Sequence, residues 1–368
     1  MIAGGGTGGH IFPAIAIAEA VERIEPAAKV FFAGRGGSLE ERVMRATGRR
    51  FLAVPSRGLR RAADARNILM PFVVLGGYTK ALVSLLGSKP DCAVGTGGFV
   101  SLPAVAAART LGAPVLLQEQ NSYPGLATRL LSRWAREVHT SFETTAGYLP
   151  ASRKTVVSGN PVREEFLTAD RTEARKRLDI AGEAAVVFVV GGSRGAHTLN
   201  AAVADAGSGL AARGVVVVAQ TGEEESETVR RSLPQDGGAI VRAFFDDVAD
   251  CYAAADLVVA RAGATTIAEI QAVGRPSVLV PYPHATEDHQ TKNAIAMEEA
   301  GASVLVPDRE MDGALLERVV TELLEDRARL MRMSDNARSL ARPDAADRVA
   351  RAVLVAARGE DAGKGRAA

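Results

Sequence analysis

Residues 1–24 read MIAGGGTGGHIFPAIAIAEAVERI, and this stretch decides the expected fold. A short apolar run leads into the glycine-rich segment 4–9, which is followed by a helical pattern over 14–24. A strand, a glycine-rich turn and a helix in this order are typical of a Rossmann-like domain. The same order recurs at 186–195 (VVFVVGGSRG), which precedes a predicted helix from about His197. We therefore predict an α/β protein with two Rossmann-like domains, each a doubly wound parallel sheet.

The length of the chain also favours two domains. One hydrophobic core usually stops growing at about 250–300 residues, and this chain has 368. Gly159-Asn160-Pro161 interrupts any regular element and marks the boundary. We predict a first domain at 1–162, a second at 163–343, a helix at about 344–357 that packs back on the first domain, and a flexible tail at 358–368. A ligand is expected in a cleft between the two domains.

Composition excludes several classes of protein. Apolar residues make up 47% and charged residues 24%, which argues against a disordered, collagen-like or disulfide-rich chain. The apolar runs are too short to span a bilayer, and the start lacks the basic and apolar regions of a secretory signal. Cys92 and Cys251 lack metal-ligand spacing, so we expect reduced structural thiols. Together these features predict a cytoplasmic location.

Positive charge is concentrated in the first half. The net charge is +1, but residues 1–162 contain 19 Lys and Arg against 10 Asp and Glu. Within residues 42–66 only Asp64 is acidic, whereas eight residues are arginine: Arg42, Arg45, Arg49, Arg50, Arg57, Arg60, Arg61 and Arg66. We expect this segment to meet an anionic partner.

Three glycine-rich turns are candidate phosphate sites. The turns at 4–9, 95–98 and 191–195 each follow a predicted strand, and their backbone N–H groups can hold a phosphate or diphosphate. His10 follows the first turn, where it can accept a proton from a bound hydroxyl. Ser193 adds a hydroxyl to the third turn. Each turn taken alone is also compatible with a tight connection, and His10 with a capping or packing role.

Two further segments carry polar groups suited to a nucleotide sugar. Residues 261–269 (RAGATTIAE) read as a loop that enters a helix, which places Glu269 near the hydroxyls of a ribose. Residues 281–293 (PYPHATEDHQTKN) gather the hydrogen-bonding side chains that a neutral polyol requires. An ordinary acid in a first helical turn and a solvated loop are the alternatives. The sequence contains no serine triad, zinc helix or Walker lysine loop, so we expect no metal or cofactor.

Several segments, taken in order, resemble the MurG family of peptidoglycan N-acetylglucosaminyltransferases. The resemblance runs from Gly4 to about residue 350 and rests on GGGTGGHIFPAIAIA, GTGGFVSLPA, QEQNSYPG, GNPVR, GGSRGAHTLN, FFDDV, RAGATTIAEI and DHQTKNA. It implies a GT-B fold and transfer of N-acetylglucosamine (GlcNAc), with inversion, from UDP-GlcNAc to the C4 hydroxyl of undecaprenyl-diphospho-MurNAc-pentapeptide (lipid I). The product would be lipid II, formed at the cytoplasmic face of the cell membrane, with other cell-wall synthesis proteins as further partners.

The resemblance also implies roles for individual residues. His10 would be the general base. The acceptor diphosphate would meet Gly5, Gly6, Thr96, Gly97 and Gly98. The donor would meet Thr7, Gly8, Gly9, Asn121, Arg163, Ser193, Phe245, Ala264, Thr265, Thr266, Ile267, Ala268, Glu269 and Gln290. Phe245 would act through its backbone at the uracil, Glu269 at the ribose and Gln290 at the sugar hydroxyls. Gln118 departs from the family, which often has histidine there, so an acid or base role is doubtful at that position.

The basic segment resembles the membrane-facing patch of the family, which implies an anionic membrane surface as its partner. No nucleic acid is expected as a partner. The predicted members of the patch form an apolar centre with a cationic rim: Arg57, Arg60, Arg61, Arg66, Ile68, Leu69, Phe72 and Leu75. A core helix with solvated arginines beside it is the alternative.

Other activities share parts of this pattern. An NAD(P)-dependent oxidoreductase has a similar first turn, but it normally has an acid after the second strand, where this chain has Arg35. An NADP enzyme can use an arginine there. A UDP-sugar epimerase or a noncatalytic nucleotide-sugar binding protein would share the domain that binds the nucleotide sugar. Neither would require His10 or a membrane patch.

Overall fold

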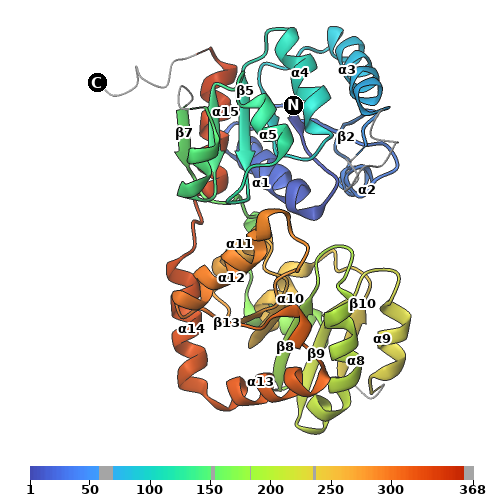
Figure 1. The fold of residues 1–368 in the computed structure, drawn as a ribbon, viewed down its shortest axis with the longest axis vertical. Helices are drawn as coiled ribbons and strands as arrows, with labels where there is room; N and C mark the ends of the chain where they lie inside the picture. The colour runs from blue at the N-terminus through green and yellow to red at the C-terminus, as the bar shows by residue number, and fades with distance from the viewer. Residues whose placement is uncertain (58–68, 151–153, 183, 235–237, 360–368) are drawn as a thin grey trace. The chain divides into compact units, whose positions relative to one another are not determined.

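The computed structural model describes residues 1–57, 69–150, 154–182, 184–234 and 238–359. It divides into two compact units, the first made of Met1–Arg163 with Arg342–Ala368 and the second of Glu164–Ala341. Each unit contains one parallel sheet with helices on both faces, so the predicted α/β class with two parallel-sheet domains is confirmed (Figure 1).

The sheet of the first unit has seven parallel strands in the order β3-β2-β1-β4-β5-β6-β7. Their bounds are β1 Ile2–Ala3, β2 Phe32–Gly34, β3 Phe51–Ala53, β4 Ala93–Gly95, β5 Val115–Glu119, β6 Glu137–Thr140 and β7 Lys154–Val157. The order reverses direction at β1, which pairs with both β2 and β4. Ligands of doubly wound folds bind at such a switch point, so the loops after β1 and β4 have the position of a binding site.

Helices cover both faces of this sheet because successive strand residues point to opposite sides. Ile2 packs in a core with α1 (Gly8–Ile24) and α15 (Ala345–Ala357), and Ala3 packs in a core with α3 (Met70–Leu86) and α4 (Ser101–Thr110). The smaller helices of this unit are α2 (Leu39–Ala46), α5 (Leu126–Leu131) and the 3-10 helix η2 (Glu143–Tyr148). The last helix of the chain therefore completes the core that the first helix begins.

The sheet of the second unit has six parallel strands in the order β10-β9-β8-β11-β12-β13. Their bounds are β8 Ala185–Val190, β9 Val215–Gln220, β10 Ala239–Arg242, β11 Leu257–Ala260, β12 Ser277–Leu279 and β13 Ser303–Leu305. The order reverses at β8, which pairs with both β9 and β11. The loops after β8 and β11 thus lie at the corresponding switch point of this unit.

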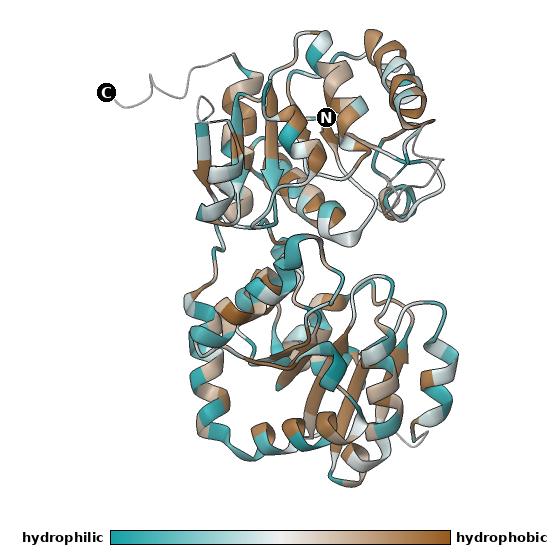
Figure 2. Cartoon of the chain, viewed as in Figure 1, coloured by the Kyte–Doolittle hydropathy of each residue, from teal (hydrophilic) through white to brown (hydrophobic). Residues whose placement is uncertain are grey.

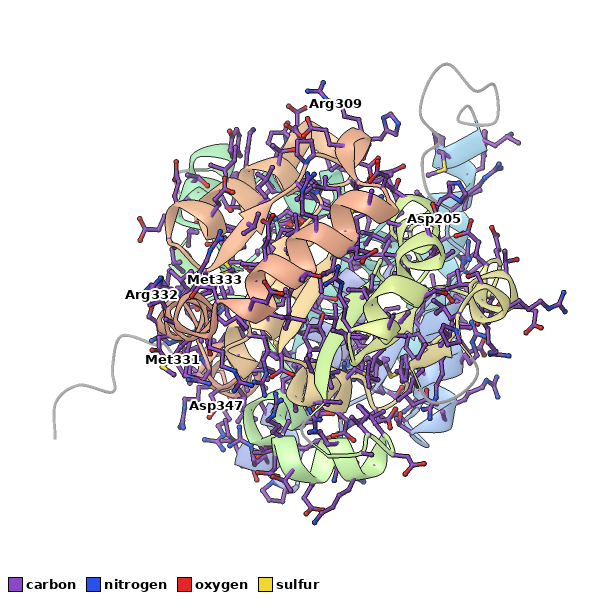
Figure 3. All side chains as sticks on the ribbon, turned by 90° about the horizontal axis from the view of Figure 1, so that it is seen from below. Asp205, Arg309, Met331, Arg332, Met333 and Asp347 are labelled. Carbon is purple, nitrogen blue, oxygen red and sulfur yellow. The ribbon has the colours of Figure 1, made fainter. Side chains whose placement is uncertain are left out.

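Two groups of helices cover the second sheet. One face packs on α8 (His197–Ala212), α9 (Ser226–Ser232), α13 (Gly313–Glu325) and α14 (Arg327–Ser339) through a largely aliphatic core. Within α14, Met333 is buried in that core, whereas Met331 is 67% exposed (Figure 3). The other helices are α6 (Glu164–Thr168), α7 (Arg171–Arg177), α10 (Val248–Ala254), α11 (Ala264–Val273), α12 (His289–Glu299) and the 3-10 helices η3 (Thr286–Asp288) and η4 (Asp308–Glu310).

Local boundaries differ from the predicted ones in one place that matters for function. The first helix, expected over 14–24, begins at Gly8, because Thr7 is extended and acts as the N-cap while the next two glycines are already helical. His10 therefore lies in the first turn of α1. Both cysteines are buried free thiols, and burial raises the pKa of Cys92 to about 12, so this thiol is protonated at neutral pH.

Candidate active site

Two glycine loops of the first unit touch each other at the switch point of the sheet. Gly98 has a φ of +78° and lies so near Gly5 that a Cβ at residue 98 would approach the Gly5 carbonyl oxygen to 2.1 Å. Only glycine fits this contact. The loops after β1 and β4 therefore bring together the five residues expected at the acceptor diphosphate: Gly5, Gly6, Thr96, Gly97 and Gly98.

The backbone amides of these loops are partly engaged. Gly6 N–H donates to a carboxylate oxygen of Glu40 at 3.2 Å, and Glu40 is only 3% exposed. The hydroxyl of Thr96 is fully buried and donates to the carbonyl oxygen of His10 at 2.9 Å. An anionic group thus lies at the first loop already, and a diphosphate that uses the Gly6 amide has to displace the Glu40 carboxylate.

His10 lies beside both loops. Its Nδ1 and the Oε1 of Gln120, which follows β5, are 3.2 Å apart. The imidazole also lies against Gly97, where a Cβ would be 2.7 Å from Nδ1. Among the described residues no hydrogen bond involves Nε2 of His10, so this nitrogen is available to a substrate hydroxyl, as a general base requires.

The loop after β5 is organised by a buried acid. Glu119, 2% exposed, accepts the backbone N–H and the side-chain amide of Asn121 with one oxygen and the backbone N–H of Gly125 with the other, at 3.0–3.1 Å. Asn121 is thereby fixed at the carboxyl end of the sheet. Gln118 is completely buried and donates to the Gly159 carbonyl at 3.1 Å, which is a packing role and offers no acid or base at that position.

The remaining residues expected at the donor in this part of the chain lie on α1 or beside it. Thr7 is the exposed N-cap, and Gly8 and Gly9 are the first two residues of the helix. The guanidinium of Arg163, the last residue of the first unit before the crossover, lies 4.4 Å from the ring centroid of Phe12. Arg163 therefore contacts α1, whereas the sequence indicated the second domain.

In the second unit the loop after β8 leads into α8 and packs on the loop after β9. A Cβ on Gly195 would lie 1.8 Å from the carbonyl oxygen of Thr221, and the φ of Gly195 is +76°. Glu225 lies beside this loop. Burial acts to raise the pKa of Glu225, but hydrogen bonds from His197 and Asn200 outweigh it and lower the pKa below its usual range, so this carboxylate is ionised at neutral pH. Ser193 is half-buried in the same loop.

Gln220 connects this loop with the residue expected at the uracil. Its Oε1 accepts the backbone N–H of Phe245 at 3.1 Å, and its Nε2 donates to the carbonyl of Gly192 at 3.3 Å. The Phe245 side chain is completely buried against Phe188. Because the Phe245 N–H is engaged, a backbone contact of Phe245 with a base would use its carbonyl oxygen.

The other predicted donor residues lie on two helix starts. Residues 264–269 form the first turns of α11, whose N-cap is Gly263, and the buried carboxylate of Glu269 accepts the Tyr252 hydroxyl at 3.2 Å. Gln290, the second residue of α12, accepts the Tyr282 N–H at 2.9 Å with its Oε1. The ring of Tyr252 packs on Phe188, which also contacts Phe245. The predicted uracil and ribose residues therefore belong to one packed group.

Three residues of these sites were not singled out from the sequence: Glu40, Gln120 and Gln220. Gln120 directly follows β5, and Gln220 is the last residue of β9. Both therefore lie at the carboxyl edge of a sheet, where ligands bind, and this position in the sequence could have identified them as site residues. Glu40 is a helical acid far along the chain from the glycines, and its sequence context gave no such signal.

The predicted membrane patch is partly within the described residues. Leu69, Phe72 and Leu75 are more than half exposed at the start of α3, and Arg57 is half-buried. Arg60, Arg61, Arg66 and Ile68 lie outside the described residues. Two further apolar residues of α3, Val83 and Leu86, are also more than half exposed, and the helix is strongly hydrophobic (Figure 2). None of the helices described is both long and apolar enough to cross a bilayer.

Both halves of the chain match models of known domains. Residues 1–140 match the glycosyltransferase family 28 N-terminal domain, and residues 186–349 match the glycosyltransferase family 28 C-terminal domain.

Curated relatives match over nearly the whole chain. The UDP-N-acetylglucosamine:N-acetylmuramyl-(pentapeptide) pyrophosphoryl-undecaprenol N-acetylglucosamine transferase of Salinibacter ruber is 42% identical over 97% of this chain and 96% of the relative. The transferase of the same description from Porphyromonas gingivalis is 40% identical over 95% and 93%.

Solved structures agree with these relatives. The crystal structure of Acinetobacter baumannii MurG is similar with a TM-score of 0.70 and 29% identity, over 96% of this chain and 98% of that one. A UDP-N-acetylglucosamine 2-epimerase structure from Listeria monocytogenes has a TM-score of 0.69 over 98% of this chain and 97% of that one, but at 12% identity this shows a shared fold alone.

Proposed function

The chain belongs to the family of N-acetylmuramyl-(pentapeptide) pyrophosphoryl-undecaprenol N-acetylglucosamine transferases, and we propose that it transfers GlcNAc from UDP-GlcNAc to lipid I to form lipid II. The observation that carries this function is the sequence identity of 42% with the Salinibacter ruber transferase over almost the full length of both chains. The chain is a glycosyltransferase with the GT-B fold, and it serves peptidoglycan synthesis.

The reaction that we propose is a direct displacement. The C4 hydroxyl oxygen of the muramyl sugar forms a bond to the anomeric carbon of GlcNAc, and the bond from that carbon to the UDP oxygen breaks with its electrons leaving on UDP. The hydroxyl proton passes to Nε2 of His10, the nitrogen without a hydrogen bond among the described residues. One displacement inverts the anomeric configuration, so the product is β-1,4-linked.

The donor is proposed to bind at the carboxyl edge of the second sheet. The amides at the start of α8 and the hydroxyl of Ser193 suit the diphosphate, since helix N-termini stabilise anions. The carbonyl of Phe245 would accept the uracil N3–H, while Glu269 would accept a ribose hydroxyl. Gln290 would meet the hydroxyls of the sugar. These groups hold the leaving UDP, so they also stabilise the charge that develops on it.

A transfer assay tests the function. The purified protein is incubated with radiolabelled UDP-GlcNAc and a synthetic lipid-linked muramyl pentapeptide, and the expected product is a labelled disaccharide lipid with release of UDP. Omission of the acceptor should abolish product formation. Conversion of the labelled donor into an epimeric UDP-sugar without any acceptor would contradict the transferase function and favour an epimerase.

The proposed place of action is the membrane surface, because the acceptor is lipid-linked. The exposed apolar residues of α3 repeat at helical spacing along one stripe, which contains Phe72, Leu75, Thr79, Val83 and Leu86. A shallow depression on this stripe is lined mainly by apolar groups. An apolar stripe beside an arginine-rich segment suits the interface of an anionic bilayer.

We expect the double variant Phe72→Ser/Leu75→Ser to bind vesicles containing anionic lipid about tenfold or more weakly, since each apolar side chain contributes about 1.5 kcal/mol or more when it is withdrawn from water. Vesicle co-sedimentation measures the change, and binding by the unmodified protein should weaken as salt rises. Met331→Ser is the matched control, because Met331 is equally exposed but lies on α14 of the other unit (Figure 3). Equal sedimentation of all three proteins would exclude the stripe from membrane binding.

A further inference from the structure

Within the described part of the chain, the imidazole of His10 has a hydrogen-bond partner at one nitrogen only. Its Nδ1 is 3.2 Å from Oε1 of Gln120, while the backbone of His10 is held separately, by the Thr96 hydroxyl on its carbonyl and by the Thr7 carbonyl on its N–H. Gly97 lies against the same side of the ring. A Cβ built on Gly97 would be only 2.7 Å from Nδ1 and 2.8 Å from Cε1 of His10. The ring therefore has one fixed edge and one edge that is free to meet a substrate.

The amide of Gln120 is itself oriented by the sheet. Gln120 is 2% exposed, and its Nε2 donates to the backbone carbonyl of Gln118 at 3.4 Å. A carbonyl oxygen only accepts hydrogen bonds, so the NH₂ group of Gln120 must face it and Oε1 must face His10. Since Oε1 also only accepts, the contact with His10 requires the proton to be on Nδ1.

We infer that Gln120 is a positioning residue that holds His10 in the tautomer protonated at Nδ1, and so leaves the lone pair on Nε2. This inference rests on the proposed function, in which His10 is the general base. The direction is set by the backbone of β5: the Gln118 carbonyl orients the Gln120 amide, and the amide selects the histidine tautomer. A histidine with its proton on the other nitrogen would present a donor to the acceptor hydroxyl and would not be able to remove its proton.

The amide performs this role without adding charge. Thr7, Thr96, Gly97 and Gln120 all contact His10, and none of these four residues is titratable. Three charged groups on the surrounding elements have partners of their own: Glu40 is held by Gly6, Glu119 by Asn121 and Gly125, and Arg163 lies over Phe12. A carboxylate in place of the Gln120 amide would keep the acceptor at Nδ1 and would favour the charged imidazolium.

Nitrogen NMR tests the tautomer without any need for activity. Long-range ¹H–¹⁵N spectra of histidine-labelled protein distinguish Nδ1–H from Nε2–H, and only five histidines have to be assigned, with a His10→Gln variant identifying the signal of interest. We expect Nδ1–H in the unmodified protein above neutral pH. In Gln120→Met, which has similar length but no acceptor, we expect that preference to be lost. Nε2–H in the unmodified protein, or an unchanged tautomer in Gln120→Met, would overturn the inference.

Kinetics of two variants give the second test. Gln120→Met should lower kcat about 10- to 100-fold with an unchanged KM for UDP-GlcNAc. Gln120→Glu should retain kcat at alkaline pH, while the acidic limb of its pH profile moves about one unit or more to higher pH. A Gln120→Glu profile that coincides with that of the unmodified protein would contradict the inference. If the unmodified protein shows the expected tautomer but transfers no GlcNAc, the proposed function fails and the assignment of Gln120 stands.

Discussion

Replacing His10 with alanine is expected to lower kcat for GlcNAc transfer by about 10²- to 10⁴-fold, the usual contribution of a positioned general base. The variant should still bind UDP-GlcNAc, because the proposed donor contacts of the second unit are untouched. The structural cost is small, since the ring is only partly buried and its side chain has one hydrogen bond among the described residues, with Gln120. Transfer is measured with the labelled donor and the lipid-linked acceptor, and donor binding by calorimetry.

A matched control comes from the other half of the chain. His197 also follows a glycine-rich turn and begins its helix, but it is strongly exposed and paired with Glu225. His197→Ala should therefore keep a kcat close to that of the unmodified protein. Undiminished turnover in His10→Ala would remove His10 from the role of base and would leave the first unit without an assigned one.

Replacing Glu269 with alanine is expected to raise the dissociation constant of UDP-GlcNAc about 10- to 150-fold. A hydrogen bond to a charged group contributes about 1.5–3 kcal/mol, and a tenfold change in affinity corresponds to about 1.4 kcal/mol. Glu269 is 7% exposed and fixed by the Tyr252 hydroxyl, so its carboxylate is already held in place before the ribose binds. Calorimetric titration with UDP-GlcNAc and with UDP measures the loss for both ligands.

Two companion variants separate ligand contact from local packing. Glu269→Gln keeps one oxygen acceptor and should lose less affinity than Glu269→Ala. Tyr252→Phe removes only the hydroxyl that orients the acid, so its effect should be smaller still, and thermal melts show whether either change destabilises the unit. Equal donor affinity in Glu269→Ala and the unmodified protein would exclude the acid from the ribose site.

Much of the fold could be predicted from local patterns. The two units of strand, glycine turn and helix were recognised because only glycine suits a close approach such as that of Gly195 to Thr221, and because buried parallel strands leave continuous apolar runs such as 186–190. The start of α1 was misplaced by six residues, since Gly8 and Gly9 are poor helix formers. Packing of the helix on the sheet outweighs their intrinsic preference.

The site could be predicted only where a residue's role follows from its own neighbours in sequence. His10 follows a glycine turn and was identified. The partners of the site residues were missed, because Glu40 reaches Gly6 across 34 residues of sequence and Gln120 reaches His10 across 110. Contacts of that separation depend on strand order, and the order β2-β1-β4-β5 that places these segments side by side is not encoded in any single motif.

The position of α15 has a consequence for how the chain matures. The core around α1 includes Val349 and Val353 from the last helix, so the amino-terminal unit remains incomplete on the ribosome until the whole second unit, roughly 180 residues, has been translated. At about 5–20 residues per second this interval lasts roughly 10–40 s. Throughout it the part of α1 that packs on α15 stays uncovered, which exposes apolar surface to chaperones until α15 has been translated.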